Sequence, residues 1–231
     1  MAGTTSRSAE PVDGVAAGDP ARLARFDRGE RLLHWLNATL MLTLLATGSA
    51  LYIPPISEAV GQRQVVLAIH VYAGIAIPFP LLLTVAARRW GAAFRADARR
   101  LNRWSVDDRR WLRTRGRDRR VRNGKFNAGQ KLNAAFTVGT IVVMLATGLI
   151  MRFPNEWPLS WRTGATFVHD WVYLAAGIAV TGHILYAIND SDALRSMWTG
   201  WVPGAWARRH APRWYEEQTG LPARPSQPGR D

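Results

Sequence analysis

The chain has 231 residues, of which 48% are hydrophobic, with a formal net charge of +13 and no cysteine. The lack of cysteine excludes a disulfide, a thiolate-held iron–sulfur cluster and a C-x-x-C-H attachment site for covalent haem. Any redox chemistry therefore requires a non-covalent cofactor and an electron source on another chain.

Nearly uncharged windows alternate with polar and basic segments along the chain. Each window has about 20 residues, enough at about 1.5 Å per residue to cross a hydrocarbon core of about 30 Å. The windows cover residues 32–53, 65–87, 132–151 and 165–188. We therefore predict an all-α integral membrane protein, a four-helix bundle, in which Pro78 and Pro80 kink the second span.

The rest of the chain is arranged around this bundle. Residues 1–25 lack an apolar run, so they are not a signal peptide. They predict a disordered tail, as does the proline-rich end at residues 220–231. The bundle takes residues 26–190, including a basic loop over residues 88–131, and residues 191–219 form a segment after the last span.

The basic loop over residues 88–131 sets the expected orientation. It contains sixteen Lys and Arg, whereas the two short loops on the other side contain three arginines. The positive-inside rule places the basic loop, and with it both termini, in the cytoplasm. Because the loop joins two spans, membrane lipid is its expected partner rather than nucleic acid. Within it, "WSVDDRRWLRT" predicts a short amphipathic surface helix with Ser105 as its N-cap.

Four of the five histidines lie inside the predicted spans, where ionisable groups are costly and usually functional. Their depths form two pairs: His70 with His169 near the outer side, and His34 with His183 near the cytoplasmic side. His169 and His183 are fourteen residues apart, so at 100° per residue they share one helix face, about 21 Å apart along the axis. His210, in the C-terminal segment, is expected to be a surface residue.

Two imidazoles facing each other at each of two levels are what bis-histidine ligation of a planar haem requires. We therefore predict two b-type haems that form an electron path across the membrane. A zinc pair fits less well because two histidines underfill a tetrahedral shell. A di-iron carboxylate site is excluded because the predicted spans contain no glutamate. A transporter with a histidine proton relay is the non-redox alternative, although it would normally need more acidic partners in the spans than this sequence has.

Electrons that reach the cytoplasmic pair need an acceptor, and "GKFNAGQKLNAAF" (124–136) precedes the third span at that level. Its Asn127, Gly129 and Gln130 are placed to hydrogen-bond a quinone carbonyl. The same letters are also typical of a helix N-terminus, and spacing alone favours this structural role.

Short repeats suggest that the two halves of the bundle are related. "LATG" occurs at 45–48 and at 145–148, each near the end of a span and before a proline-containing loop. "AGIA" occurs at 73–76 and at 176–179. Four-letter matches among apolar residues are weak evidence, so the relation is a hypothesis.

The chain resembles the gamma subunit of membrane-bound respiratory formate dehydrogenases, a di-haem cytochrome b. The resemblance extends from about Arg25 to Thr219. It rests on "RLLHWLNA", "AIHVYAGIAI", "KFNAGQK", the spacing of His169 and His183, and the tail "WARRHAPRWYEE" (206–217). The "KFNAGQK" segment and the "HAPRWY" tail are specific to this group, whereas isolated transmembrane histidines are shared with hydrogenase cytochrome b subunits.

The resemblance implies specific roles for residues of this chain. The outer haem is expected on His70 and His169 and the inner haem on His34 and His183, the pairs that depth also suggests. A site for menaquinone or ubiquinone beside the inner haem is expected to be formed by Asn127, Ala128, Gly129, Gln130 and His183.

The resemblance also implies the partners and the location. An iron–sulfur beta subunit is expected to deliver electrons from a catalytic alpha subunit, so this chain would be the quinone-reducing subunit of an oxidoreductase complex and would not itself oxidise formate. The expected location is the bacterial cytoplasmic membrane. Service to a hydrogenase or another respiratory oxidoreductase is the alternative.

Overall fold

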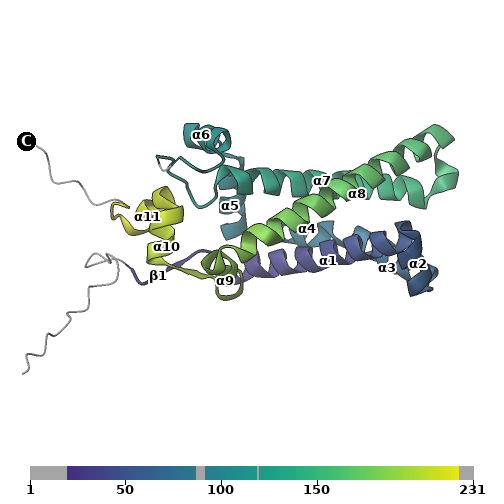
Figure 1. Cartoon of the computed structure of the whole chain (residues 1–231), viewed down its shortest axis with the longest axis horizontal. Coiled ribbons are helices and arrows are strands. Elements are labelled where there is room, and N and C mark those ends of the chain that lie inside the picture. The colour runs from purple at the N-terminus through teal and green to yellow at the C-terminus, as the bar shows by residue number, and fades with distance from the viewer. Residues whose placement is uncertain (1–19, 87–91, 119, 224–231) are drawn as a thin grey trace, which may run out of the picture.

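The computed structural model describes residues 20–86, 92–118 and 120–223, and this part of the chain is mostly helical, as predicted. The longest helices run side by side along the long axis of the molecule (Figure 1). They are α1 (Arg28–Tyr52), α3 (Arg63–Ala76) continued by α4 (Pro78–Ala86), α7 (Ala128–Arg152) and α8 (Leu159–Ile188). Helix α1 packs mainly on α3, and α7 mainly on α8, which makes two helical hairpins.

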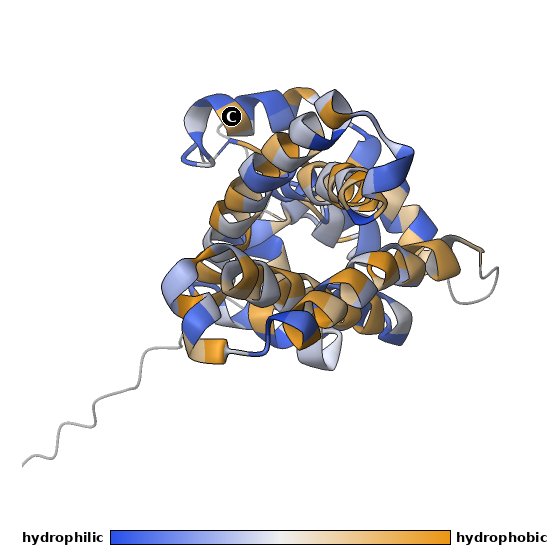
Figure 2. Ribbon diagram, turned by 90° about the vertical axis from the view of Figure 1, so that its right-hand side faces the viewer, coloured by the Kyte–Doolittle hydropathy of each residue, from blue (hydrophilic) through white to orange (hydrophobic). Residues whose placement is uncertain are grey.

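These helices have the length and composition of membrane spans. Arg63–Leu83, α7 and α8 each qualify alone, and α1 qualifies together with α2 (Pro54–Val60), from which it is bent by 100°. In Arg63–Leu83, α7 and α8, only 17%, 11% and 6%, respectively, of the most apolar stretch of the helix is buried inside the protein. The apolar side chains therefore face outward, where lipid rather than water must cover them, and the chain is a membrane protein. Viewed end-on, the long helices are largely orange, the colour of hydrophobic residues (Figure 2).

Sequence signals at helix ends agree with the observed boundaries. Helix α6 (Val106–Thr114) begins after Ser105, whose side chain accepts a hydrogen bond from the Asp108 N–H, so the predicted loop helix is confirmed. In the second span, α3 ends at Ala76 and α4 begins at Pro78. The interruption falls at the predicted prolines, because proline lacks the N–H that would continue the helical hydrogen bonding.

The segments outside the spans gather at one end of the bundle, opposite α2 and the turn between α7 and α8 (Figure 1). That turn contains a single 3-10 turn, η1 (Pro154–Glu156). The gathered segments comprise strand β1 (Arg22–Ala24), α5 (Ala92–Asn102), α6, α9 (Ser191–Thr199), strand β2 (Trp201–Pro203), α10 (Gly204–His210) and α11 (Pro212–Thr219). We call this the basic end, because the arginine-rich loop lies there.

Two expectations for the tails need correction. Residues 22–24 were expected in a disordered tail of an all-α protein, yet β1 pairs antiparallel with β2. The pairing is extended by the Arg25 N–H, which donates to the Gly200 carbonyl at 2.8 Å, and Val202 of β2 is buried in a small core with Trp206, Trp214 and Tyr215. Residue 223 was expected in the second disordered tail, over residues 220–231, yet Ala223 is buried against the same core. Residues 1–19 and 224–231 lie outside the described part of the chain.

Candidate paired-histidine sites

The structure brings together the same two pairs of histidines that depth along the spans suggested. His34 of α1 faces His183 of α8 with ring centroids 6.2 Å apart and planes at 55°. His70 of α3 faces His169 of α8 with centroids 6.3 Å apart and planes at 61°. We call them the inner pair, at the basic end, and the outer pair. Helix α8 supplies one member of each.

The spacing within both pairs suits one metal centre between two imidazoles. A metal–imidazole nitrogen bond is about 2 Å, and a ring nitrogen lies about 1 Å from its ring centroid, so two trans ligands place their centroids about 6 Å apart. No group of three or more His, Cys, Asp or Glu able to hold a metal ion occurs in the described part of the chain. A centre with only two protein ligands fits a haem, whose macrocycle supplies the other donors, and not a closed zinc site.

Each histidine of the outer pair is hydrogen-bonded to a threonine. Thr47 Oγ1 lies 2.9 Å from His70 Nδ1, and Thr147 Oγ1 lies 2.9 Å from His169 Nδ1. Sequence reasoning missed both threonines as site residues. The signal was present in the repeated "LATG", whose third letter is Thr47 in one copy and Thr147 in the other.

Residues next to the inner pair attach α9 to the bundle. Trp35, which follows His34, donates its indole N–H to the Met197 carbonyl at 3.0 Å and packs on Trp198 with ring centroids 4.0 Å apart. The inner pair thus lies where the spans meet the C-terminal segment. His210 is exposed, as expected, and its Nδ1 donates to the Trp206 carbonyl at 3.1 Å.

The segment expected to bind quinone forms the start of α7. The Asn127 side chain accepts from the Gln130 N–H at 2.9 Å, and the Gln130 side chain accepts from the Asn127 N–H at 3.0 Å, which is a capping box. Ala128 is fully buried, and a Cβ added at Gly129 would lie 2.7 Å from the indole of Trp111. The structural role that spacing favoured is therefore present.

The capping box leaves part of each amide group unused. It occupies the side-chain oxygens of Asn127 and Gln130, whereas their NH₂ groups make no hydrogen bond within the described residues. The structure does not link this segment to His183 by any hydrogen bond or ring contact among those residues.

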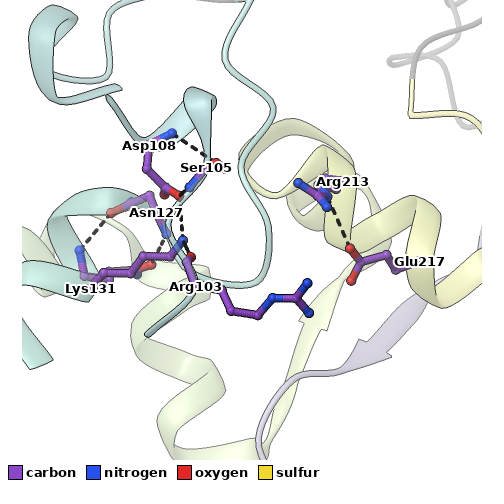
Figure 3. A network of polar contacts seen from close by, with 8 residues as sticks. Arg103, Ser105, Asp108, Asn127, Lys131, Arg213 and Glu217 are labelled. Carbon is purple, nitrogen blue, oxygen red and sulfur yellow. Dashed lines mark hydrogen bonds and ion pairs between the residues drawn. The ribbon is translucent and has the colours of Figure 1, made fainter. Parts of the chain in front are cut away.

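Buried ion pairs tie the basic loop to the start of α7. Lys131 Nζ lies 2.8 Å from Asp108 Oδ2, with both side chains less than 10% exposed, and it also donates to the Arg103 carbonyl at 2.8 Å (Figure 3). Burial alone would raise the pKa of Asp108, but hydrogen bonds from Lys131 and Ser105 outweigh it and hold that pKa below its ordinary value. The carboxylate is therefore charged at neutral pH.

A second buried cluster joins α1, α5 and the loop before α7. Lys125 Nζ forms a close ion pair with Asp97 and lies 3.8 Å from Glu30 Oε1. Nearby, Arg25 stacks over the Trp206 ring at 4.4 Å, and burial lowers the pKa of its guanidinium to about 10. Sequence reasoning counted Lys125 among the charges of the basic loop, placed Arg25 in the tail and did not find the cluster.

Pairs of histidines about 6 Å apart on membrane-spanning helices are typical of membrane proteins that bind haem without a covalent bond. The chain belongs to the prokaryotic cytochrome b561 family, whose model matches residues 25–200. Membership of this family implies haem b.

Relatives support the resemblance to formate dehydrogenase subunits. The chain is 26% identical to the "Formate dehydrogenase, cytochrome b556 subunit" of Haemophilus influenzae, over 88% of this chain and 87% of the relative. It is 24% identical to the "Formate dehydrogenase, cytochrome b556(fdo) subunit" of Escherichia coli K12, over 84% and 92%. It is 26% identical to the nitrate-inducible cytochrome b556(Fdn) subunit of the same organism, over 81% and 88%.

Proposed function

We propose that this chain is the di-haem cytochrome b subunit of a membrane-bound formate dehydrogenase and that it carries electrons across the membrane to a quinone. The observation that carries the proposal is the presence of two histidine pairs with nearly equal spacing, 6.2 and 6.3 Å, on one bundle. Haem b, when bound, supplies one-electron transfer by cycling between ferric and ferrous iron. A proton relay through histidines would not require two pairs of imidazoles whose separation fits one metal ion between the rings.

In this proposal the two pairs have separate positions on the electron path. His70 and His169 hold the outer haem, and His34 and His183 hold the inner haem, within a four-span bundle over residues 26–190. The bent α1–α2 pair counts as the first span, which gives four. The two pairs share α8, so one helix fixes their separation at about 1.5 Å per residue.

The orientation follows from charge. The basic end lies in the cytoplasm by the positive-inside rule, and both termini lie on that side of the bacterial cytoplasmic membrane. An iron–sulfur partner subunit, itself reduced by a catalytic subunit, delivers electrons to the outer pair from the other side. The names of the relatives as subunits of formate dehydrogenase support the presence of further subunits. In this proposal the chain takes no part in the oxidation of formate itself.

Quinone reduction belongs at the start of α7, near the inner pair. Two electrons and two protons convert the quinone to quinol. The NH₂ groups of Asn127 and Gln130, which the capping box leaves unused, are the donors for a quinone carbonyl. Ala128 and Gly129 keep the intervening backbone close-packed, and His183 of α8 is the remaining residue proposed for the site.

The first test of the proposal is the haem content of the purified chain. A reduced-minus-oxidised spectrum with haem quantified per polypeptide is expected to give about two b-type haems. One haem would remove one of the pairs from the proposal. Folded protein without haem, grown with adequate haem supply, would refute the redox function and favour a proton relay.

The quinone site is tested by variants that keep the helix cap. Asn127→Asp and Gln130→Glu retain the side-chain oxygens of the capping box, since aspartate and glutamate are good residues at these positions. Both lose the NH₂ donor, so quinone reduction is expected to fall at least tenfold while haem content stays unchanged. Asn123→Asp is the control, because it adds the same charge outside the cap and otherwise removes only an exposed hydrogen bond to the His210 carbonyl at 3.3 Å. Normal quinone turnover in both cap variants would move the site elsewhere.

A further inference from the structure

Two threonines occupy equivalent places in the two halves of the bundle. Thr47 and Thr147 are the third letters of the two "LATG" copies, in α1 and α7. Each contacts Nδ1 of a histidine on the helix that completes its hairpin, and both distances are 2.9 Å. The repeat that was weak evidence in the sequence thus marks a contact that the fold makes twice.

The direction of these hydrogen bonds follows from counting protons on the hydroxyl groups. Thr47 Oγ1 lies 2.7 Å from the Thr43 carbonyl, and Thr147 Oγ1 lies 2.8 Å from the Val143 carbonyl. A carbonyl can only accept, so each hydroxyl gives its one proton to its own helix. Each hydroxyl must then accept from the imidazole, which places the imidazole proton on Nδ1.

The tautomer that results is the one suited to ligation. A neutral imidazole carries a proton on one nitrogen only, so a proton on Nδ1 leaves the Nε2 lone pair free. A hydrogen bond at the second nitrogen also fixes the ring and raises the basicity of the ligand. The free Nε2 lone pair and the higher basicity both require that the threonine hydroxyl accept the hydrogen bond from Nδ1 rather than donate one to it.

The glycine after each threonine lies beside the same ring. A Cβ added at Gly48 would lie 3.7 Å from His70 Cε1, and one at Gly148 would lie 3.6 Å from His169 Cε1. The backbone of α1 and of α7 therefore borders the imidazole edge directly. A Cβ at 3.6–3.7 Å would make ordinary van der Waals contact with either ring, and the tighter neighbour of Gly48 is Tyr173, at 3.0 Å. The part of Thr-Gly that acts on the histidine in both halves is therefore the threonine hydroxyl.

The inner pair has no equivalent of this arrangement. Within the part of the chain that the structure describes, neither His34 nor His183 shares a hydrogen bond with a side-chain hydroxyl. The two pairs have similar spacing, but the imidazoles of the outer pair have hydroxyl partners that those of the inner pair lack among the described residues.

We propose, on the basis of the proposed function, that Thr47 and Thr147 are positioning residues that hold the outer pair in the Nδ1-protonated tautomer and lower the reduction potential of the outer haem below that of the inner one. The more basic ligands stabilise the ferric state at the outer site. Electrons that enter at the outer pair then move to a site of higher potential, toward the basic end.

Isosteric variants of the full chain test this role. Thr47→Val and Thr147→Val keep the shape and remove the acceptor, and the corresponding serine variants keep the hydroxyl. Thr137→Val is the matched control, because Thr137 donates to the Asn133 carbonyl on the same helix as Thr147 but contacts no histidine. The readouts are the haem content, a potentiometric titration of the reduced-minus-oxidised spectrum and the electron paramagnetic resonance g values of the oxidised protein.

The valine variants are expected to shift one of the two haem components to higher potential, so that its reduced fraction exceeds one half at the wild-type midpoint. The g values of that component should change as well, while the serine variants and Thr137→Val match the wild type. Loss of one haem in the valine variants alone, with rescue by serine, would equally support positioning. Unchanged potentials and g values with two haems retained, or the same shift in Thr137→Val, would overturn it. A wild-type chain without haem would instead refute the proposed function, and that is measured before any variant.

Discussion

Removal of the buried ammonium of Lys131 should destabilise the junction between the basic loop and the bundle. Its Nζ lies 2.8 Å from Asp108 Oδ2, and the two side chains are 9% and 7% exposed. Loss of one member of a buried ion pair typically costs about 3–5 kcal/mol, because the remaining charge is unpaired. In Lys131→Met the Ser105 backbone N–H and hydroxyl still donate to Asp108, at 2.7 and 2.8 Å. We therefore expect the lower end, about 3 kcal/mol.

Thermal unfolding in detergent measures this effect. At about 2–4 °C per kcal/mol for a chain of this size, the midpoint should fall by roughly 6–12 °C. Trypsin should also cut the arginine-rich loop faster, because that loop is attached through this ion pair. Arg213→Met is the control, since its ion pair with Glu217 is exposed (Figure 3) and such pairs are worth about 0–1 kcal/mol. Equal midpoints for the two variants would refute the assigned cost of burial.

The same ion pair should make stability depend on pH. The pKa of Asp108 is held below its ordinary value when folded, so its contribution is present above the unfolded pKa of about 4. It is lost as the pH falls through the lower, folded pKa. The advantage of the wild type over Asp108→Asn should therefore be constant at neutral pH and shrink below about pH 4. A constant advantage down to low pH would contradict this sign.

Three further changes, with Gly139→Ala as a control for the third, have distinct expected outcomes. His34→Ala should lower the haem content by about one per chain through the inner site, and His70→Ala should do so through the outer site, with separable spectra. A haem content identical to that of the wild type in either variant would reject that assignment. Gly129→Ala should destabilise the chain by about 1–3 kcal/mol, since its Cβ would lie 2.7 Å from Trp111 Cη2. Gly139→Ala, whose Cβ meets nothing within 4 Å, should not lower the unfolding midpoint and should raise it slightly, because alanine is the better helix former.

The spans and the pairing of histidines could be predicted from the sequence because both depend on position along the chain. A span is a run of apolar residues, and the depth of a histidine follows from its distance to the end of that run. The starts of α7 and α6 could also be predicted, since Asn127 and Ser105 begin capping boxes that involve only the next few residues.

Contacts between helices could not be predicted in the same way. Thr47 meets His70 only because α1 and α3 pack with a particular rotation, and a four-letter repeat does not specify which way a side chain faces. The buried cluster of Lys125, Asp97 and Glu30 combines residues up to 95 positions apart. Strand β1 was missed because its partner, β2, lies more than 170 residues further along the chain.

The two ends of the molecule differ in buried charge. The buried charged residues that the structure describes are Arg25, Asp97, Asp108, Lys125 and Lys131. They come from the β1–α1 connection, α5, α6, the loop before α7 and the start of α7, the segments that meet at the basic end. At the outer pair, by contrast, the hydrogen-bond partners of the histidines are neutral hydroxyl groups. Charged groups are tolerated where headgroups and water are near and are costly at depth. A site that takes up protons with electrons suits the charged end, whereas a site that only passes electrons does not need charged neighbours. The proposed function divides the roles in this way between the quinone site at the start of α7 and the outer pair.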